Sequence, residues 1–262
     1  MKYLIIGDGW IGNLLKAYLG DKATIFQGKI NDFNSEIGEQ YDVWINTAAK
    51  TQIDWVEKNR EEAFDVNAIQ ANYLASMAKE CGKKYVFFSS ACIFESSDIN
   101  DIKYEDSEPN PKCFYAETKV MAEKLILQVN PDSLIIRPRL PLSEKPHPRN
   151  TINKLLSYDK INGNQESVTV VEDMIPVLID LIDKNEKGVF HLVNEGTISP
   201  AEIATAFKHP FTLVTKQEQD ERLAKEGRAK RVTTYVGSKR IKLLPNIRER
   251  MTKLVETYNG KI

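Results

Sequence analysis

Tyr115 and Lys119 carry the first chemical signal in this sequence, because they stand four residues apart in Tyr115-Ala116-Glu117-Thr118-Lys119. On a helix, this spacing puts both side chains on one face. An ammonium group beside a phenol favours the phenolate and lowers the tyrosine pKa from its reference value of about 10. The phenol then becomes a usable proton donor for a carbonyl group that is being reduced. The same spacing also occurs in ordinary pairs on a helix surface.

Ser90 supplies a hydroxyl group that fits the same chemistry. Ser89 and Ser90 follow the apolar run 85–88, which predicts a strand covered on both faces of a parallel sheet. The carboxyl end of such a strand points into the crevice where ligands bind. Ser90, Tyr115 and Lys119 together therefore predict a site for carbonyl reduction, and the combination is more specific than any one of its parts.

A glycine motif lies near the start of the chain. Gly7-Asp8-Gly9-Trp10-Ile11-Gly12 follows a strand predicted over residues 2–6 and begins a predicted helix. In this setting the first glycine permits a tight turn, the second lets a pyrophosphate approach the backbone, and the third lets helix and strand pack closely. The helix N-terminus offers free N–H groups to the pyrophosphate. We therefore predict that these six residues bind a dinucleotide; a purely structural glycine turn is the alternative.

The end of the second predicted strand, residues 23–26, bears on the choice between NAD and NADP. An acidic residue at this point binds the ribose 2′-hydroxyl and repels a 2′-phosphate. The sequence continues with Gln27-Gly28-Lys29 and has no acid immediately after the strand. Lys29 could pair with a 2′-phosphate, or it is an ordinary surface lysine. The sequence thus favours NADP(H) over NAD(H).

Strands and helices alternate along the first half of the chain. Apolar runs predict further strands at 43–46 and 134–136, and helical periodicity appears at 61–80 and 116–129. One face of the helix predicted over 61–80 is formed by Phe64, Ala68, Ala71, Ala75 and Ala78. This alternation predicts the α/β class with a Rossmann-type, doubly wound parallel sheet.

The pattern loosens after Arg137. Residues 137–149 contain four prolines and predict an irregular loop near the carboxyl edge of the sheet. Further elements are expected as helices at 151–160 and 171–184 and a strand at 189–193.

Two parts follow from this order of elements. We expect an NADP-binding Rossmann core over residues 1–147, continued by parts of 163–194. A small C-terminal substrate-binding lobe should occupy most of 148–262, including the charged and mixed tail from 211 onward.

The composition narrows the classes of partner. The 262 residues carry a formal net charge of -1, so no overall field favours nucleic acid or an anionic membrane. No stretch approaches the ~20 apolar residues of a membrane helix. Three cysteines without CxxC spacing favour a reduced, cytoplasmic setting. The three histidines lack metal-ligand spacing, and no metal is expected.

With these motifs, the chain resembles the extended short-chain dehydrogenase/reductase superfamily, and within it the dTDP-4-dehydrorhamnose reductase-like enzymes. Three further segments carry the resemblance: Asn46-Thr47-Ala48-Ala49, Asp65-Val66-Asn67-Ala68 and Glu108-Pro109-Asn110-Pro111. The resemblance implies that the turn with Ala48 and Ala49 lies beside the cofactor. It also implies Ser90 as the hydroxyl partner of the substrate carbonyl, Tyr115 as the acid and Lys119 as its modulator, with a further contact to the nicotinamide ribose.

A narrower resemblance is to the bifunctional nucleotide-rhamnose synthases, which are 3,5-epimerases and 4-reductases of UDP-4-keto-6-deoxyglucose. Its segments are Gly9-Trp10-Ile11-Gly12, Ile53-Asp54-Trp55, Cys92-Ile93-Phe94-Glu95 and Pro148-Arg149-Asn150. It implies that Cys92 and Lys154 exchange protons at C3 and C5, where the 4-ketone acidifies the C–H bonds. Cys92 is otherwise a small buried hydrophobe, and Lys154 is otherwise a solvated helix lysine.

The predicted function is NADPH-dependent conversion of a UDP- or dTDP-linked 4-keto-6-deoxyglucose to the nucleotide-linked L-rhamnose. Lys50, Arg149 and Asn150 are expected to contact the nucleotide sugar, although Arg149 and Asn150 could instead shape the loop. One alternative is a simple 4-keto reductase without epimerase activity. Another is a non-catalytic NADP-binding regulatory subunit, against which the complete set of Ser90, Tyr115 and Lys119 argues. A homodimer is possible.

Overall fold

A six-stranded sheet organises the first part of the molecule, which we describe from a computed structural model covering residues 1–259. The strands are β1 (Tyr3–Ile6), β2 (Ala23–Phe26), β3 (Val43–Asn46), β4 (Lys84–Phe88), β6 (Leu134–Arg137) and β10 (Gly188–His191). They lie in the order β10-β6-β4-β3-β1-β2, and the pairs from β6 to β2 are parallel. The predicted Rossmann-type α/β fold is confirmed.

The direction of the chain reverses beside β1. The chain moves from β1 outward to β2 and then returns to β3 on the other side, so β1 and β3 form the switch point. Ligands in open α/β sheets bind outside the carboxyl ends of the strands at such a point. Only β2 lies beyond β1, whereas the common six-stranded dinucleotide-binding order places two strands there.

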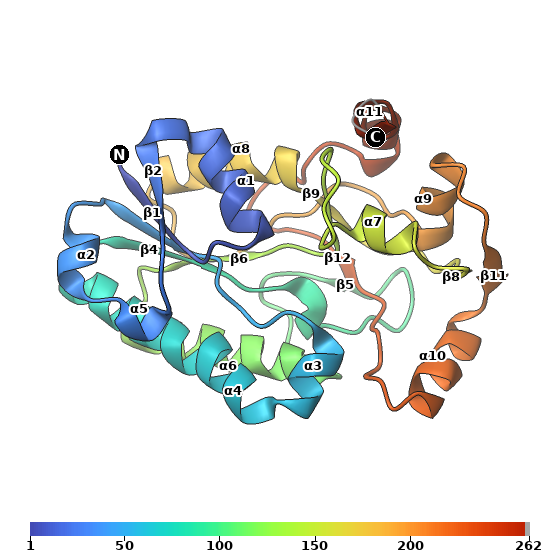
Figure 1. Ribbon diagram of the computed structural model, residues 1–262, viewed down its shortest axis with the longest axis horizontal. Helices are drawn as coiled ribbons and strands as arrows, with labels where there is room; N and C mark the ends of the chain where they lie inside the picture. The colour runs from blue at the N-terminus through green and yellow to red at the C-terminus, as the bar shows by residue number, and fades with distance from the viewer. Residues whose placement is uncertain (260–262) are drawn as a thin grey trace. The chain divides into compact units, whose positions relative to one another are not determined.

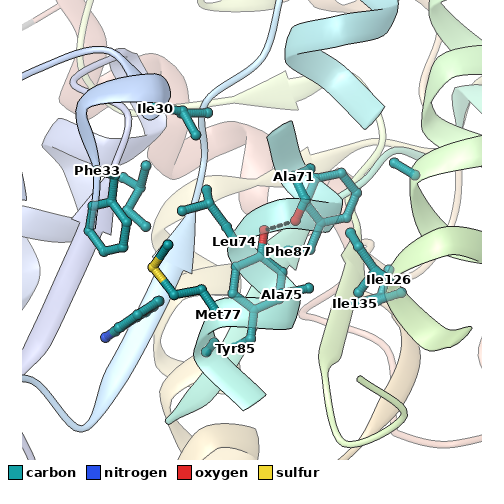
Figure 2. Close-up of a cluster of buried hydrophobic side chains, with 14 of the residues drawn as sticks. Ile30, Phe33, Ala71, Leu74, Ala75, Met77, Tyr85, Phe87, Ile126 and Ile135 are labelled. Atoms are coloured by element: carbon teal, nitrogen blue, oxygen red, sulfur yellow. Dashed lines mark hydrogen bonds between the residues drawn. The ribbon is translucent and has the colours of Figure 1, made fainter. Parts of the chain in front are cut away.

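Helices cover both faces of this sheet, as the buried apolar strands require. In Figure 1, α1 (Trp10–Leu19) lies on one side of the sheet, and α5 (Gln70–Glu80) and α6 (Phe114–Val129) lie on the other. Figure 2 shows the core beneath α5 and α6, to which the labelled residues Leu74, Ala75, Met77, Tyr85, Phe87, Ile126 and Ile135 contribute. The Tyr85 hydroxyl is satisfied there, since it donates to the Ala71 carbonyl at 2.9 Å.

The helix predicted over 61–80 contains a local irregularity. It consists of α4 (Arg60–Phe64), a π-helical turn η3 (Asp65–Ile69) and then α5. The expected apolar face is present, because Ala68, Ala71, Ala75 and Ala78 are fully buried. Shorter elements of this part are α2 (Ser35–Glu39), α3 (Ile53–Lys58), η1 (Gly20–Lys22), η2 (Ile30–Asp32) and η4 (Ala91–Ile93).

The described chain folds into two compact units. The first comprises residues 1–93, 113–137 and 178–190, and the second comprises 94–112, 138–177 and the described residues from 191 onward. Helix α8 (Val171–Asp183) contributes to both units. No helix among residues 1–259 is long and apolar enough to cross a membrane.

The second unit has its own apolar core and three two-stranded sheets. Its helices are α7 (Thr151–Leu155), α9 (Pro200–Ala206), α10 (Lys216–Lys225) and α11 (Ile247–Asn259). Its sheets pair β12 (Tyr235–Val236) with β5 (Ile102–Lys103), β7 (Pro141–Leu142) with β9 (Thr169–Val170), and β11 (Thr212–Val214) with β8 (Lys160–Asn162). The prediction of a helix over 151–160 is wrong beyond Leu155, because the chain turns and then pairs as β8.

Candidate functional site

The glycine turn after β1 is required by space as well as by backbone conformation. Gly7 adopts φ +112°, and a Cβ placed there would lie 2.7 Å from the Ala48 nitrogen. A Cβ on Gly12 would lie 2.2 Å from the Gly7 carbonyl oxygen. The first and third glycines therefore let the ends of β1 and β3 and the start of α1 approach closely.

The start of α1 is open to an anion. Gly9 is the N-cap residue, no side chain caps the helix, and no acidic residue lies in its first turn. A Cβ on Gly9 would meet nothing within 4 Å, so a bulky group can approach the backbone at this point. The Asn13 amide donates to the Asp8 and Gly9 carbonyls at 2.6 and 3.0 Å and holds the turn. These features fit a dinucleotide pyrophosphate.

The turn after β3 lies directly beside the glycine turn. The backbone N–H groups of Thr47 and Ala48 donate to the Ile6 carbonyl at 2.9 and 3.1 Å. The side-chain oxygen Oδ1 of Asn46 accepts from Ala48 N at 3.0 Å, and the side-chain nitrogen Nδ2 of Asn46 donates to the Tyr85 hydroxyl at 2.9 Å. Buried Asn46 thus fixes the predicted cofactor turn with Ala48 and Ala49 at the switch point.

Lys29 lies just after β2, where its side chain is exposed. No acid follows this strand immediately, but Asp32 comes three residues after Lys29. In the structure the Asp32 carboxylate accepts a hydrogen bond from the Lys29 backbone N–H at 3.3 Å. Both a cation and an anion are therefore present near the position that discriminates between the two cofactors.

Ser90, Tyr115 and Lys119 are brought together within the first unit. Tyr115 and Lys119 lie on α6, and Ser90 follows β4. All three side chains are buried, with Lys119 only 1% exposed. The Ser90 side chain lies close enough to the Tyr115 hydroxyl to influence its pKa, and the Lys119 ammonium donates to the Phe88 carbonyl at 2.8 Å. The three predicted site residues therefore lie in one compact unit, and their role in carbonyl reduction stays a prediction.

The pKa of Tyr115 differs from the expectation that Lys119 would lower it. Burial raises the pKa of Tyr115, and the thiol of Cys92 raises it further against the opposing hydrogen bond from Ser90. Lys119 is not among the groups that shift the pKa of Tyr115, so the expected lowering by Lys119 is not seen. A raised pKa keeps the phenol protonated at neutral pH, which is the state that a proton donor needs. Burial also lowers the pKa of Lys119 to about 7.

Two cysteines, Cys92 and Cys113, lie close enough to Tyr115 to influence its pKa. Cys92 is half-buried in η4 and its backbone N–H donates to the Ser90 hydroxyl at 3.1 Å. Cys113 is buried and precedes α6 as its N-cap residue. Both thiols act electrostatically on Tyr115. The resemblance described above implies a role for Cys92 and none for Cys113.

Lys154, Arg149 and Asn150 lie in the second unit around the start of α7. Asn150 is fully buried, accepts from Ile152 N at 3.1 Å and donates to the Ser143 and Lys145 carbonyls. These contacts shape the proline-rich loop. Arg149 and Lys154 are exposed. Partial burial of its amine nevertheless lowers the pKa of Lys154, and the charges of Arg149 and Arg231 lower it further.

Lys50 is held by its neighbours in the first unit. Its ammonium pairs with Glu62 at 2.7 Å and lies 4.9 Å from the centre of the Trp55 ring. Its backbone N–H and carbonyl are both bonded by the buried Asn67 of the π-helical turn. Asn67 also donates to the Thr118 hydroxyl at 3.1 Å, so it connects the cofactor turn to the helix that carries Tyr115 and Lys119.

A buried ionic cluster next to the site was missed by the sequence reasoning. Glu123 accepts hydrogen bonds from Ser89 and from Arg137, whose Nε lies 2.8 Å from Glu123 Oε1. The only local signal is an acid one helical turn after Lys119, on a helix face that is otherwise buried. Among the described residues, no group of three or more His, Cys, Asp or Glu side chains could hold a metal ion.

Comparison with known proteins shows which protein family the chain matches. The family model for the RmlD substrate binding domain matches residues 31–232. Arabidopsis thaliana has a trifunctional UDP-glucose 4,6-dehydratase/UDP-4-keto-6-deoxy-D-glucose 3,5-epimerase/UDP-4-keto-L-rhamnose-reductase that is 29% identical over 226 residues. The match covers 79% of this chain and 34% of that protein, so the chain spans about a third of the relative's length.

A shorter relative is covered more fully. The bifunctional dTDP-4-dehydrorhamnose 3,5-epimerase/dTDP-4-dehydrorhamnose reductase of Arabidopsis thaliana is 28% identical over 224 residues, which are 79% of this chain and 74% of the relative.

Solved structures agree with the fold. The UDP-rhamnose synthase from Acanthamoeba polyphaga mimivirus has a TM-score of 0.87 at 23% identity, covering 98% of this chain and 99% of that one. The dTDP-4-dehydrorhamnose reductase from Bacillus anthracis, solved in complex with NADP, has a TM-score of 0.78 at 19% identity, with 100% of both chains covered.

Proposed function

Because the chain belongs to the RmlD substrate binding domain family, we propose that it is an oxidoreductase that uses NADPH to reduce a nucleotide-linked 4-keto-6-deoxyhexose. The observation that carries the proposal is that the buried residues Ser90, Tyr115 and Lys119 lie in the same compact unit as the glycine turn. The names of the similar Arabidopsis thaliana proteins, which include a UDP-4-keto-L-rhamnose reductase and a dTDP-4-dehydrorhamnose reductase, support the substrate class.

The chain's own groups supply binding and proton transfer. The peptide N–H groups at the start of α1 hold the pyrophosphate, the turn with Ala48 and Ala49 lies against the cofactor, and Lys29 pairs with the 2′-phosphate. NADPH, when bound, supplies the hydride that adds to C4 of the sugar. Ser90 and Tyr115 donate hydrogen bonds to the ketone oxygen, and Tyr115 transfers its proton to that oxygen to complete the alcohol. Lys119 holds the nicotinamide ribose and stabilises the phenolate left behind.

Tyr115→Phe tests this assignment. The substitution keeps the buried ring and removes the proton donor, so kcat/KM for NADPH oxidation with UDP- or dTDP-4-keto-6-deoxyglucose should fall about 10²- to 10⁴-fold. NADPH affinity should change little. Tyr73→Phe at an exposed position is the matched control and should keep full activity. A Tyr115→Phe enzyme with wild-type kcat/KM would remove the tyrosine from the chemistry.

Binding without turnover is a separate outcome. Tight NADPH binding by the wild-type protein, combined with no NADPH oxidation for any UDP- or dTDP-linked 4-keto sugar, would favour a non-catalytic NADP-binding regulator.

Epimerisation at C3 and C5 is the finer part of the proposal. A thiol and an amine with a lowered pKa can remove and return the protons that the 4-ketone acidifies. Cys92 lies two residues from Ser90 and acts electrostatically on Tyr115, and neighbouring cations together with partial burial lower the pKa of Lys154. The name of the bifunctional 3,5-epimerase/reductase relative supports this role.

Deuterium incorporation separates the bifunctional enzyme from a simple reductase. With NADPH and UDP-4-keto-6-deoxyglucose in D₂O, the reduced product should carry deuterium at C3 and C5. Cys92→Ala and Lys154→Met should each suppress incorporation, while Cys81→Ala and Lys145→Met serve as matched controls. Reduction without deuterium at either carbon would leave a simple 4-keto reductase that receives an epimerised substrate.

A further inference from the structure

Glu123 is a buried carboxylate with three donors around it. It lies on α6 and is 5% exposed. The Ser89 hydroxyl and the Arg137 Nε both donate to Oε1, and the Arg137 Nη2 donates to Oε2. Ser89 N additionally donates to the Ile136 carbonyl at 2.8 Å. The cluster therefore joins α6 to the carboxyl ends of β4 and β6, immediately next to Ser90.

Lys119 is the second buried charge of this helix, four residues before Glu123. Its ammonium donates to the Phe88 carbonyl at 2.8 Å and lies 4.5 Å from the centroid of the Phe87 ring. Neither contact carries a full negative charge. Residues four apart on a helix lie one above the other on the same face, so the Glu123 carboxylate is the anion nearest to this ammonium along α6.

We infer that Glu123 is a positioning residue of the proposed reductase, which favours the protonated form of Lys119 and fixes the segment that carries Ser90. The inference rests on the proposed function and adds a residue to its machinery. Glu123 acts through Lys119 and Ser89 and touches neither substrate nor cofactor in this account. A reductase needs the positive charge on Lys119 because that charge stabilises the phenolate of Tyr115 after proton transfer.

The charges around Lys119 support this role. Burial lowers the pKa of Lys119, and the charge of Glu123 raises it again. Arg137 on β6 binds the Glu123 carboxylate, and Cys92 in η4 and Cys113 before α6 act on Tyr115 of the same helix. Glu123 is the carboxylate of this set, so its loss leaves Lys119 and Arg137 as two buried cations.

A purely structural role predicts a different result. If Glu123 only pairs with Arg137, its replacement lowers stability and reduces activity equally at every pH. If it sets the charge of Lys119, replacement also moves the alkaline limb of the pH profile, because Lys119 then loses its proton at a lower pH.

Glu123→Gln is the direct test, measured as the pH dependence of kcat/KM for keto-sugar reduction. We expect the alkaline limb to move down by about one pH unit or more, since an opposite charge at close range shifts a pKa by that amount. Glu117→Gln removes the same charge from an exposed position of the same helix and should leave the limb in place. Glu123→Asp keeps the negative charge, so the alkaline limb of this variant should lie close to that of the wild type. An unmoved limb in a folded Glu123→Gln enzyme would overturn the inference.

A second variant and a second readout keep the test decisive. If Glu123→Gln does not fold, Glu123→Gln combined with Arg137→Met also removes the cation that Glu123 binds. The double variant should still show a downward shift, smaller than that of Glu123→Gln because a nearby positive charge is lost together with the negative one. The pH dependence of NADPH affinity should move with the limb, and it requires no sugar. Wild-type protein that binds no NADPH would refute the proposed function, whereas identical wild-type and variant pH profiles would refute only the role of Glu123.

Discussion

Burial acts on Tyr115 and Lys119 of α6 so that each favours its neutral form. It raises the pKa of Tyr115 and lowers the pKa of Lys119 to about 7. The phenol is therefore protonated and ready to donate at neutral pH, while the lysine lies close to the midpoint of its titration. The sequence pattern identified both residues and Ser90, but it did not reveal how strongly burial would dominate their charges.

The lysine makes a prediction about stability. An unfolded lysine keeps its proton up to about pH 10.4, whereas folded Lys119 loses it near pH 7. Between these values the unfolded chain binds more protons, so the free energy of unfolding contributed by Lys119 rises with pH, by at most about 1.4 kcal/mol per pH unit.

Urea denaturation of the wild type and of Lys119→Met, at pH 7 and at pH 9, measures this contribution. The wild type should gain stability relative to the variant as the pH rises. A difference that is constant with pH, or one that changes in the opposite direction, would show that Lys119 keeps its charge in the folded protein.

The ion pair between Glu123 and Arg137 is a feature of individual residues that sequence reasoning did not predict. Tyr115, Lys119 and Ser90 follow from local spacing and from their places after a strand and on a helix. The partner of Glu123 is Arg137, on a different element, and only the three-dimensional packing of α6 against β6 brings the two side chains together.

At the scale of elements, the glycine turn shows that three residues of one type have different tasks. Gly7 and Gly12 are needed where backbone approaches backbone, while Gly9 faces open space at the start of α1. Gly9→Ala and Gly12→Ala therefore form a matched pair that separates cofactor binding from folding.

Gly9→Ala should fold with a Tm within a few degrees of the wild type and bind NADPH at least about tenfold more weakly, because the added methyl occupies the space the pyrophosphate needs. Gly12→Ala should lose stability, since its Cβ would clash with the Gly7 carbonyl. Thermal unfolding and fluorescence titration with NADPH measure both effects. Unaltered NADPH affinity in Gly9→Ala would argue against a pyrophosphate at this turn.

The π-helical turn η3 is a feature that periodicity does not predict. Spacings of three and four residues indicated one continuous helix over 61–80, and the apolar face is indeed continuous. The extra residue in the turn accompanies a buried Asn67, which holds both Lys50 and Thr118. Such an insertion depends on those distant hydrogen-bond partners, which a local pattern does not contain.

For the whole molecule, the first unit was more predictable than the second. The strands of the large sheet are mostly apolar runs that local sequence reveals, although local sequence does not predict that only β2 lies beyond β1. The second unit is built from strands of two or three residues that pair over long distances, such as Ile102–Lys103 with Tyr235–Val236. Runs of this length carry no periodicity, so residues 211–259 could be placed only as part of a lobe.

Cofactor binding should stabilise the folded chain. NADPH at about 100 times its Kd adds about 2.7 kcal/mol of stability and should raise Tm by roughly 5–10 °C. NADH at the same concentration should raise Tm less. Lys29→Ala should remove most of this difference, with Lys22→Ala as the exposed-lysine control. If NADPH and NADH raised the Tm of the wild type equally, Lys29 would have no role in cofactor selectivity.

The central claim is hydride transfer from NADPH to C4 of a nucleotide-linked keto sugar. Its most direct test uses the (4R)- and (4S)-deuterated forms of NADPH with UDP-4-keto-6-deoxyglucose and with its dTDP counterpart, and locates deuterium in the product by NMR. We predict that one of the two deuterated forms transfers its deuterium to C4 and that Tyr115→Phe greatly slows the transfer. A wild-type protein that binds NADPH but leaves C4 unlabelled with both forms and both sugars would contradict the assignment.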